Sequence, residues 1–348
     1  MHTQITSATE HETISRTEFK RRRRLAGRAR RAALTAAMAV LSIGALAGPA
    51  TASASAQSRY NIVTLDNQHD PTFNQLLGIN QSGVIAGYFG SGAQGHANKG
   101  YLVFQPYGQG NYMNENFPGS VQTQVTGLND RGVTVGFWSD QNNANQMNDN
   151  FGFYKLSGHY HNVNVPVAQN GTMNATPPVN QLLGVNDHNV AVGFYTDSQG
   201  NNHGYTYSIK HNSYGEITVP GATSTTAAAI NNWGDIAGFY TDATGNTHAF
   251  LRSQDGSVIT LDAPGATGTQ ALGVNDEGEV VGVYTVGSGS SAQMHGFTWN
   301  EIQGFRTVDD PHGIGTTTIN GVNDRGDLVG FYVDGAGNTD GMLAAPRQ

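Results

Sequence analysis

The strongest constraint on the fold is a six-residue motif that recurs six times along the chain. Its third residue is always asparagine, and successive asparagines are 44 to 57 residues apart. The copies are residues 78–83, 127–132, 184–189, 229–234, 273–278 and 321–326. Repetition at this period is typical of chains built by stacking one small supersecondary unit, such as propellers and solenoids.

Each copy has the chemistry of a hairpin turn. Asn and Asp accept a left-handed backbone and bond their own main chain, and Gly supplies a positive φ, so Asn-Asp-x-Gly predicts a turn between two strands. We therefore assign the repeated asparagine a structural role. The fifth unit indicates four strands, over residues 270–274, 280–284, 296–299 and 304–308.

The second strand of the unit decides the architecture. In residues 236–240, Ile236, Gly238 and Tyr240 share one face while Ala237 and Phe239 share the other. Both faces are apolar, which indicates a strand covered on both sides by neighbouring sheets.

The two ends of the chain indicate a closed ring. Residues 60–66 resemble a fourth strand, and the chain ends on the third strand of its last unit, so the N-terminal strand is expected to complete that unit. The sequence predicts an all-β, six-bladed β-propeller of four-stranded blades, closed by an N-terminal strand. A linear solenoid is the alternative fold.

The N-terminal segment has the pattern of a bacterial export signal. Arg21 to Arg24 precede an apolar stretch over residues 32–47, and Ala54-Ser55-Ala56 forms an A-x-A cleavage site. We expect residues 1–56 to be a signal peptide and residues 57–348 to be one six-repeat domain, secreted and without a membrane span. Arg22-Arg23-Arg24-Leu25 also partly resembles a twin-arginine signal.

Without the leader, the chain keeps 9 basic and 23 acidic residues, a net charge of −14. Such a surface repels nucleic acid and anionic lipid, so the expected partner is an extracellular polysaccharide or protein. The chain has no cysteine, and disulfides therefore play no part. We expect a monomer.

A triplet at the start of the third strand reads His248-Ala249-Phe250, with variants at residues 203–205 and 295–297. These residues resemble the family of extracellular HAF-repeat proteins, over essentially the whole chain after the leader. The resemblance implies export and a β-repeat fold, and it implies no defined activity. In three units the histidine is replaced, by Lys99, Asn150 and Asp340.

Two links between units carry ionisable residues where the others carry small ones. If the ring closes, both links flank the sixth unit, and their side chains would meet at one face. The candidate catalytic residues are Asp309, Asp310, His312, Asp66, His69 and Asp70. Such a cluster could bind a divalent cation or act as an acid/base pair, and solvated turn residues are the alternative. We assign no metal site and expect no cofactor beyond that cation.

A binding surface is predicted at the same face. One aromatic residue ends the second strand of every unit, and the two longest insertions, residues 141–150 and 166–179, are rich in polar side chains. The candidate ligand-binding residues are Trp138, Asn142, Asn143, Asn145, Asn170 and Asn174. Inter-blade packing for the aromatic residues, and loops without fixed structure, are the alternatives.

The sequence lacks a nucleophile elbow, a phosphate-binding loop and a dinucleotide fingerprint. This favours a binding module for an extracellular polymer, either a polysaccharide or a cell-wall component. An extracellular hydrolase or lyase acting on a polysaccharide through the Asp/His cluster is the first alternative. A structural protein-interaction propeller is the second.

Overall fold

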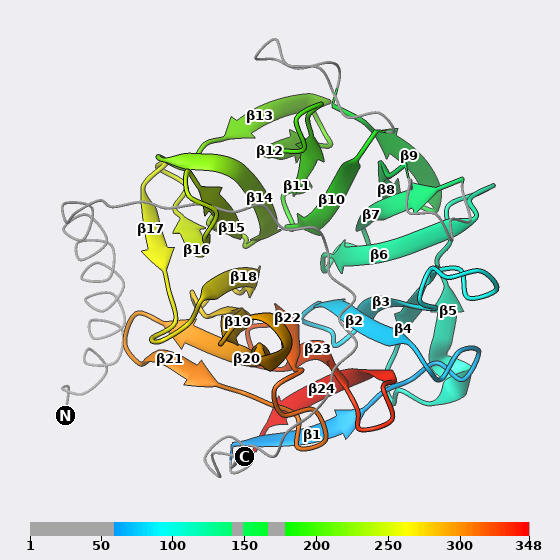
Figure 1. Cartoon of the computed structure of the whole chain (residues 1–348). Helices are drawn as coiled ribbons and strands as arrows, with labels where there is room; N and C mark the ends of the chain where they lie inside the picture. The colour runs from blue at the N-terminus through cyan, green and yellow to red at the C-terminus, as the bar shows by residue number, and fades with distance from the viewer. Residues whose placement is uncertain (1–58, 141–148, 166–177, 348) are drawn as a thin grey trace, which may run out of the picture.

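A computed structural model describes residues 59–140, 149–165 and 178–347. Within these ranges the chain forms six four-stranded antiparallel sheets arranged around a central axis (Figure 1). The six-bladed β-propeller predicted from the repeats is thus confirmed. The proposed leader lies outside the described residues. No helix in the described part is long and apolar enough to cross a membrane.

Within each blade the strands follow chain order outward from the axis, except that the last blade takes its outer strand from the N-terminus. Blade one contains β2 (Asn74–Ile79), β3 (Ile85–Phe89), β4 (Lys99–Val103) and β5 (Tyr112–Asn114). Blade two contains β6 (Gln122–Leu128), β7 (Thr134–Ser139), β8 (Phe151–Leu156) and β9 (His159–Val163). Blade three contains β10 (Asn180–Val185), β11 (Val190–Thr196), β12 (Asn202–Ser208) and β13 (Ser213–Ile217).

The remaining blades repeat the pattern. Blade four contains β14 (Ala222–Ile230), β15 (Ile236–Asp242), β16 (Thr247–Arg252) and β17 (Val258–Leu261). Blade five contains β18 (Gly268–Val274), β19 (Val280–Val286), β20 (Gln293–Asn300) and β21 (Gly304–Thr307). Blade six contains β22 (Thr318–Val322), β23 (Leu328–Val333), β24 (Thr339–Pro346) and β1 (Tyr60–Thr64). Two short 3-10 turns are η1 (Gln109–Asn111) and η2 (Gly289–Ser291).

The N-terminal strand closes the ring. β1 pairs antiparallel with β24, from Tyr60 opposite Pro346 to Thr64 opposite Met342. The Leu65 amide continues the ladder by donating to the Gly341 carbonyl at 2.8 Å. The last blade therefore has four strands, like the other five.

The first strands of adjacent blades pack backbone to backbone at the axis. A Cβ atom added to Gly127 would lie 2.8 Å from the Leu183 carbonyl oxygen and 3.1 Å from the Gly184 Cα. Such distances leave no room for a side chain. The six motifs accordingly place a small residue here: Gly78, Gly127, Gly184, Ala229, Gly273 and Gly321.

The motif asparagine ties each blade to the next. Asn129 Oδ1 accepts from the amides of Arg131 and Val133 within its own turn, at 3.0 and 2.9 Å. Its Nδ2 donates to the Asn186 carbonyl of the next blade, at 2.9 Å. The same inter-blade bond is made from Asn80, Asn186, Asn231, Asn275 and Asn323, so the six form a closed circuit. This accounts for the asparagine in every copy.

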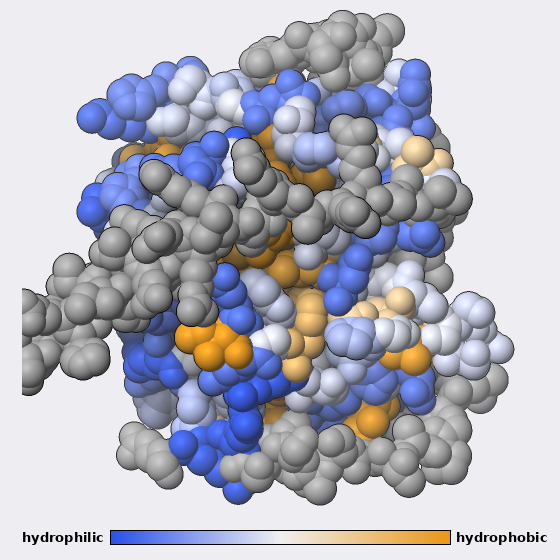
Figure 2. All heavy atoms as spheres, turned by 90° about the vertical axis from the view of Figure 1, so that its left-hand side faces the viewer, coloured by the Kyte–Doolittle hydropathy of each residue, from blue (hydrophilic) through white to orange (hydrophobic). Residues whose placement is uncertain are grey.

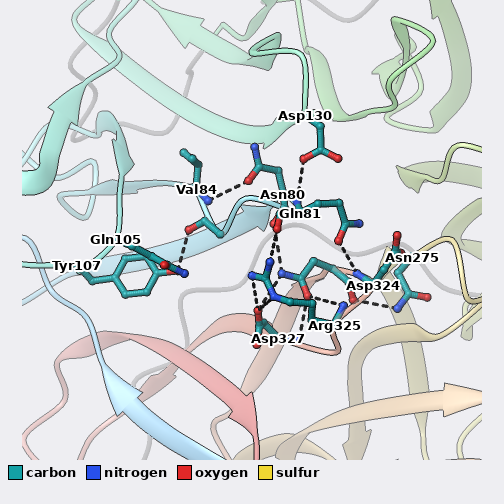
Figure 3. Close-up of polar contacts among 12 residues, drawn as sticks. Asn80, Gln81, Val84, Gln105, Tyr107, Asp130, Asn275, Asp324, Arg325 and Asp327 are labelled. Carbon is teal, nitrogen blue, oxygen red and sulfur yellow. Dashed lines mark hydrogen bonds and ion pairs between the residues drawn. The ribbon is translucent and has the colours of Figure 1, made fainter.

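The next residue of each motif builds a second circuit beside the first. Its backbone amide donates to the side chain at the same position in the following blade, as Gln81 does to Asp130 at 2.8 Å (Figure 3). The other bonds run from Asp130, Asp187, Asn232, Asp276 and Asp324, the last to Gln81 Oε1. Figure 3 shows how the circuit passes from blade six to blade one through Asp324 and Gln81.

The hydrophobic core lies between blades. One cluster joins Val133, Val135 and Val163 of blade two to Leu182 and Tyr205 of blade three. Equivalent clusters fill the other described junctions. The second strands are buried on both faces, as the two-sided apolar pattern predicts.

Candidate functional site

The loops between second and third strands, and the links between blades, lie at one end of the propeller, here called the loop end. The motif turns lie at the opposite, turn end. Figure 2 shows a side of the ring whose described surface is mostly hydrophilic, with hydrophobic atoms in small separate groups. The described candidate residues lie in links between blades or at the end of a second strand, and so belong to the loop end.

In blades three to five a tyrosine from the second strand stacks on the histidine of the third strand. The ring centroids are 4.9 Å apart for Tyr195 and His203, 5.2 Å for Tyr240 and His248, and 5.4 Å for Tyr284 and His295. The two residues are direct cross-strand partners in each blade. The HAF-like triplet thus places an imidazole against an aromatic face.

Each of these imidazoles also meets a carboxylate. His203 Nε2 lies 2.9 Å from Asp197 Oδ2, and His295 Nδ1 lies 2.8 Å from Asp309 Oδ2. His248 lies between two carboxylates, with Nδ1 3.0 Å from Asp262 and Nε2 3.3 Å from Asp242. The imidazole orientation is therefore set by its acidic partners.

The aromatic side chains at the strand ends are also bonded to the fourth strand. The Tyr240 hydroxyl lies 3.2 Å from Thr260 Oγ1, and the Tyr284 hydroxyl lies 2.7 Å from Thr307 Oγ1. In blade two the Trp138 indole nitrogen donates to Asn162 Oδ1 at 2.8 Å. Stacking and hydrogen bonding within each blade thus fix the orientation of these aromatic side chains.

Three blades depart from the triplet, and one of them corrects the sequence register. Phe151, and not Asn150, is the cross-strand partner of Trp138, and their rings lie 4.8 Å apart. Phe153 pairs with Gly136 as Phe250 pairs with Gly238, so residues 151–153 are the equivalent of His248-Ala249-Phe250. Lys99 and Asp340 occupy the histidine position in blades one and six, as expected.

The six predicted Asp/His residues divide among three blades. Asp309 pairs with His295 in blade five. His69 stacks on Phe89 of blade one, with centroids 5.7 Å apart, and Asp70 Oδ2 lies 2.7 Å from His96 Nδ1 in the same blade.

Asp310, His312 and Asp66 are the three that face blade six. Asp310 is buried and accepts from the His312 backbone amide at 2.8 Å, and the His312 ring lies 6.3 Å from Tyr332. Asp66 Oδ1 accepts from the Gly341 amide at 2.9 Å.

Blade six therefore holds a concentration of carboxylates. Burial raises the pKa of Asp66 to about 6, against the effect of the Gly341 amide, and the charges of Asp340 and Asp334 raise it further. Burial and then the Asp334 charge raise the pKa of Asp340. No group of three or more His, Asp or Glu side chains among the described residues is arranged to hold a metal ion.

Of the predicted ligand-binding residues, Trp138 is described. One face of its indole stacks on Phe117 from the link, with centroids 4.6 Å apart and ring planes 6° apart. Asn142, Asn143, Asn145, Asn170 and Asn174 lie outside the described residues.

No protein-family model matches this chain, and no curated protein matches it. Solved structures with a similar fold include AofleA from Arthrobotrys oligospora, with a TM-score of 0.50 at 11% identity over 82% of this chain and 85% of that chain. A streptogramin B lyase has a TM-score of 0.47 at 11% identity, over 84% and 100% of the two chains. A variant of the Aleuria aurantia lectin, in complex with Fucalpha1-6GlcNAc, has a TM-score of 0.44 at 12% identity, over 80% and 95%. At these identities the likeness is one of fold alone.

Proposed function

We propose that this protein is an exported HAF-repeat-type binding module for an extracellular polysaccharide. The observation that supports this most is the repeated arrangement at the loop end, where aromatic rings, imidazoles and carboxylates lie side by side in successive blades. Sugar-binding sites need apolar faces for ring C–H groups and a few fixed acceptors for hydroxyls.

Several polar groups of this end remain open to solvent. The side chains of His312, His96 and Asp262 are 75%, 55% and 50% exposed. A chain repeating one arrangement around a ring can contact a polymer at several points, which multiplies weak individual contacts. The strong negative charge favours a neutral polymer over an anionic one.

The test is depletion of the mature protein, residues 57–348, by insoluble polysaccharides. We expect a neutral polysaccharide to remove it from solution. The variant His248→Ala should weaken this depletion, whereas Trp233→Ala at the turn end should not. Trp233 is a suitable control because it is 58% exposed and lies on the opposite end. Failure of every polymer and cell-wall preparation to deplete the wild-type protein would contradict the proposal.

An extracellular hydrolase or lyase is a second candidate, favoured by the carboxylates of blade six. Hydrogen bonds from the Asn338 and Ala336 amides outweigh burial and lower the pKa of Asp334, whereas the pKa of Asp66 is raised. Two carboxyl groups whose pKa values are shifted in opposite directions suit acid/base catalysis. Release of reducing ends that is abolished in Asp66→Asn and retained in His248→Ala would support this candidate.

A further inference from the structure

An open pocket lies between blades two and three. It is shallow and open to solvent, and it is lined by Val165, Tyr195, Gly204, Tyr205, Tyr214, Gly215 and Glu216. We call it the tyrosine pocket. Three of its seven lining residues are aromatic, and one is a carboxylate.

Blade two shows why blade three has an opening at this place. Trp138, Phe153 and Tyr160 hold the register positions of Tyr195, Tyr205 and Tyr214 in blade three. In blade two the link residue Phe117 fills the space over them, with ring centroids 4.6, 5.8 and 5.5 Å away.

The link residue at the same offset before blade three is Val165. A valine is several carbon atoms smaller than a phenylalanine, so the aromatic trio of blade three is left partly uncovered. Val219 and Ala263 stand at this offset before blades four and five, so the pocket depends on the small link side chain together with the tyrosines and Gly215 of blade three.

The fourth strand of blade three also differs from its counterparts. At the register where Thr260 and Thr307 meet a tyrosine hydroxyl, blade three has the exposed carboxylate of Glu216. One residue earlier it has Gly215, where blade four has Ile259. The glycine removes bulk from the mouth of the pocket, and the glutamate places an anionic acceptor there.

The floor of the pocket carries an unsatisfied polar atom. The Tyr205 hydroxyl has no hydrogen-bond partner among the described residues, and neither has the neighbouring Asn180 Oδ1. Tyr205 is 2% exposed, and burial raises its pKa, opposed by the Asn180 side chain. Buried polar atoms without partners are rare in folded proteins and often mark a place for a ligand group or water.

We propose that the tyrosine pocket binds one neutral hexopyranose residue at its mouth. This sugar would be the residue of the bound polysaccharide that the protein recognises most specifically. This rests on the proposed function. Tyr214, the most exposed of the three tyrosines, would pack against the C–H groups of the sugar ring, and Glu216 would accept hydrogen bonds from hydroxyls at the mouth. A uronic acid is disfavoured because its carboxylate would meet that of Glu216.

The test is saturation-transfer NMR on residues 57–348 with methyl glycosides of glucose, galactose, mannose, N-acetylglucosamine and glucuronic acid. We expect at least one neutral glycoside to bind and the glucuronide not to bind. Val165→Phe, which copies the filling residue of blade two, should weaken binding by tenfold or more. Glu216→Thr, which copies blades four and five, should weaken it by about tenfold through loss of a charged acceptor.

The matched control is Glu301→Gln, since Glu301 is an exposed glutamate in the β20–β21 turn. It should bind like wild type. Glu216→Thr alters an exposed residue and keeps the test valid if Val165→Phe does not fold. Unchanged glycoside binding in both pocket variants, or no glycoside binding to the wild-type protein, would overturn the proposal that the tyrosine pocket binds a sugar.

The polymer assay separates this outcome from failure of the proposed function. Polysaccharide depletion that persists in both pocket variants leaves the binding module in place and rejects the pocket. Glycoside binding that Val165→Phe abolishes, with no polymer depleting wild type, keeps the pocket and rejects the polymer module.

Discussion

Asn323 donates a hydrogen bond from Nδ2 to the main-chain carbonyl of Asn80, 3.2 Å away, and so joins the last motif of the chain to the first. Closure of the propeller therefore rests on two separate sets of contacts. It is made at the rim by β1 pairing with β24, and near the axis by the asparagine circuit. The two closures lie on different strands of blade six, which ties its inner and outer edges to the N-terminal part of the chain.

Replacing one asparagine of the circuit should destabilise the whole ring. Asn129→Ala removes two bonds within the turn and two to the next blade, at a site that is 4% exposed. At about 1 kcal/mol for each bond, we expect a loss of about 4 kcal/mol in the free energy of unfolding, measured by urea denaturation. Arg131→Ala, an exposed change in the same turn, should stay within about 0.5 kcal/mol. Equal effects of the two variants would contradict the structural role.

Removing β1 should open the outer edge of blade six. A protein that begins at residue 66 lacks the partner of β24 and exposes an unpaired strand, so we expect a lower melting temperature and concentration-dependent aggregation. A synthetic peptide of residues 59–65 added in trans should raise the melting temperature again, and a peptide of the same composition in scrambled order should not. Identical melting temperatures of the shortened and complete proteins would show that the pairing of β1 with β24 contributes little to stability.

The fold could be predicted because its signals are local and repeated. The turn chemistry of Asn-Asp-x-Gly is contained in four residues, and the two-sided apolar pattern of β15 is contained in seven. Closure followed from comparing the chain ends with an internal strand, which needs no knowledge of distant contacts.

The site was predictable only in part, because neighbours in a link point to different blades. Asp309 reaches His295 in blade five, whereas Asp310, next in sequence, is buried beside blade six. Similarly, Asp66 bonds blade six and Asp70 contacts blade one. A link alternates its side chains as it crosses from one blade to the next, and that alternation depends on backbone torsions the sequence pattern does not reveal.

The tyrosine pocket was also not found from sequence. It depends in part on a volume difference between Phe117 and Val165, each of which precedes a proline in the link between two blades. An alignment of the links, counted from the end of each fourth strand, would have placed these two residues at one position. The signal was therefore present, but it lay in a comparison between repeats rather than in any single repeat.

The carboxylates of blade six should make stability depend on pH. The pKa of Asp66 is raised to about 6 in the folded protein, so folding favours its protonated form. Its stabilising contribution is present below about pH 4 and is lost as the pH rises through about 6. Asp66→Asn keeps an acceptor for the Gly341 amide but cannot ionise. We expect it to melt at a higher temperature than wild type at pH 8 and at a similar temperature at pH 4.

Asp334→Asn supplies the opposite case in the same blade. The pKa of Asp334 is lowered because backbone amides outweigh burial, so its contribution is present at neutral pH and is lost on acidification. This variant should lose stability at pH 7 and little at pH 3. The melting temperatures of both variants, measured between pH 3 and pH 8, check this pair of predictions. The same pH dependence of the melting temperature in both variants would contradict the opposite pKa shifts of Asp66 and Asp334.

A buried ion pair joins blades one and two. Glu115 is 1% exposed, its Oε2 lies 2.6 Å from Lys155 Nζ, and its Oε1 accepts from the Thr134 hydroxyl at 2.8 Å. Lys155→Met would leave this carboxylate buried without its cation. We expect a loss of about 3 to 5 kcal/mol in the free energy of unfolding, by urea denaturation.

Two further variants of this pair separate charge from packing. Glu115→Gln combined with Lys155→Met removes both charges, and because the cost of Lys155→Met comes mainly from the uncompensated carboxylate, we expect more than half of the lost stability to return. Lys210→Met, at an exposed lysine, should change stability by about 0.5 kcal/mol or less. A double variant as unstable as Lys155→Met would mean that Lys155 stabilises the junction through other contacts, such as that of its Nζ with the Tyr160 ring, whose centroid lies 5.1 Å away, rather than through its pairing with Glu115.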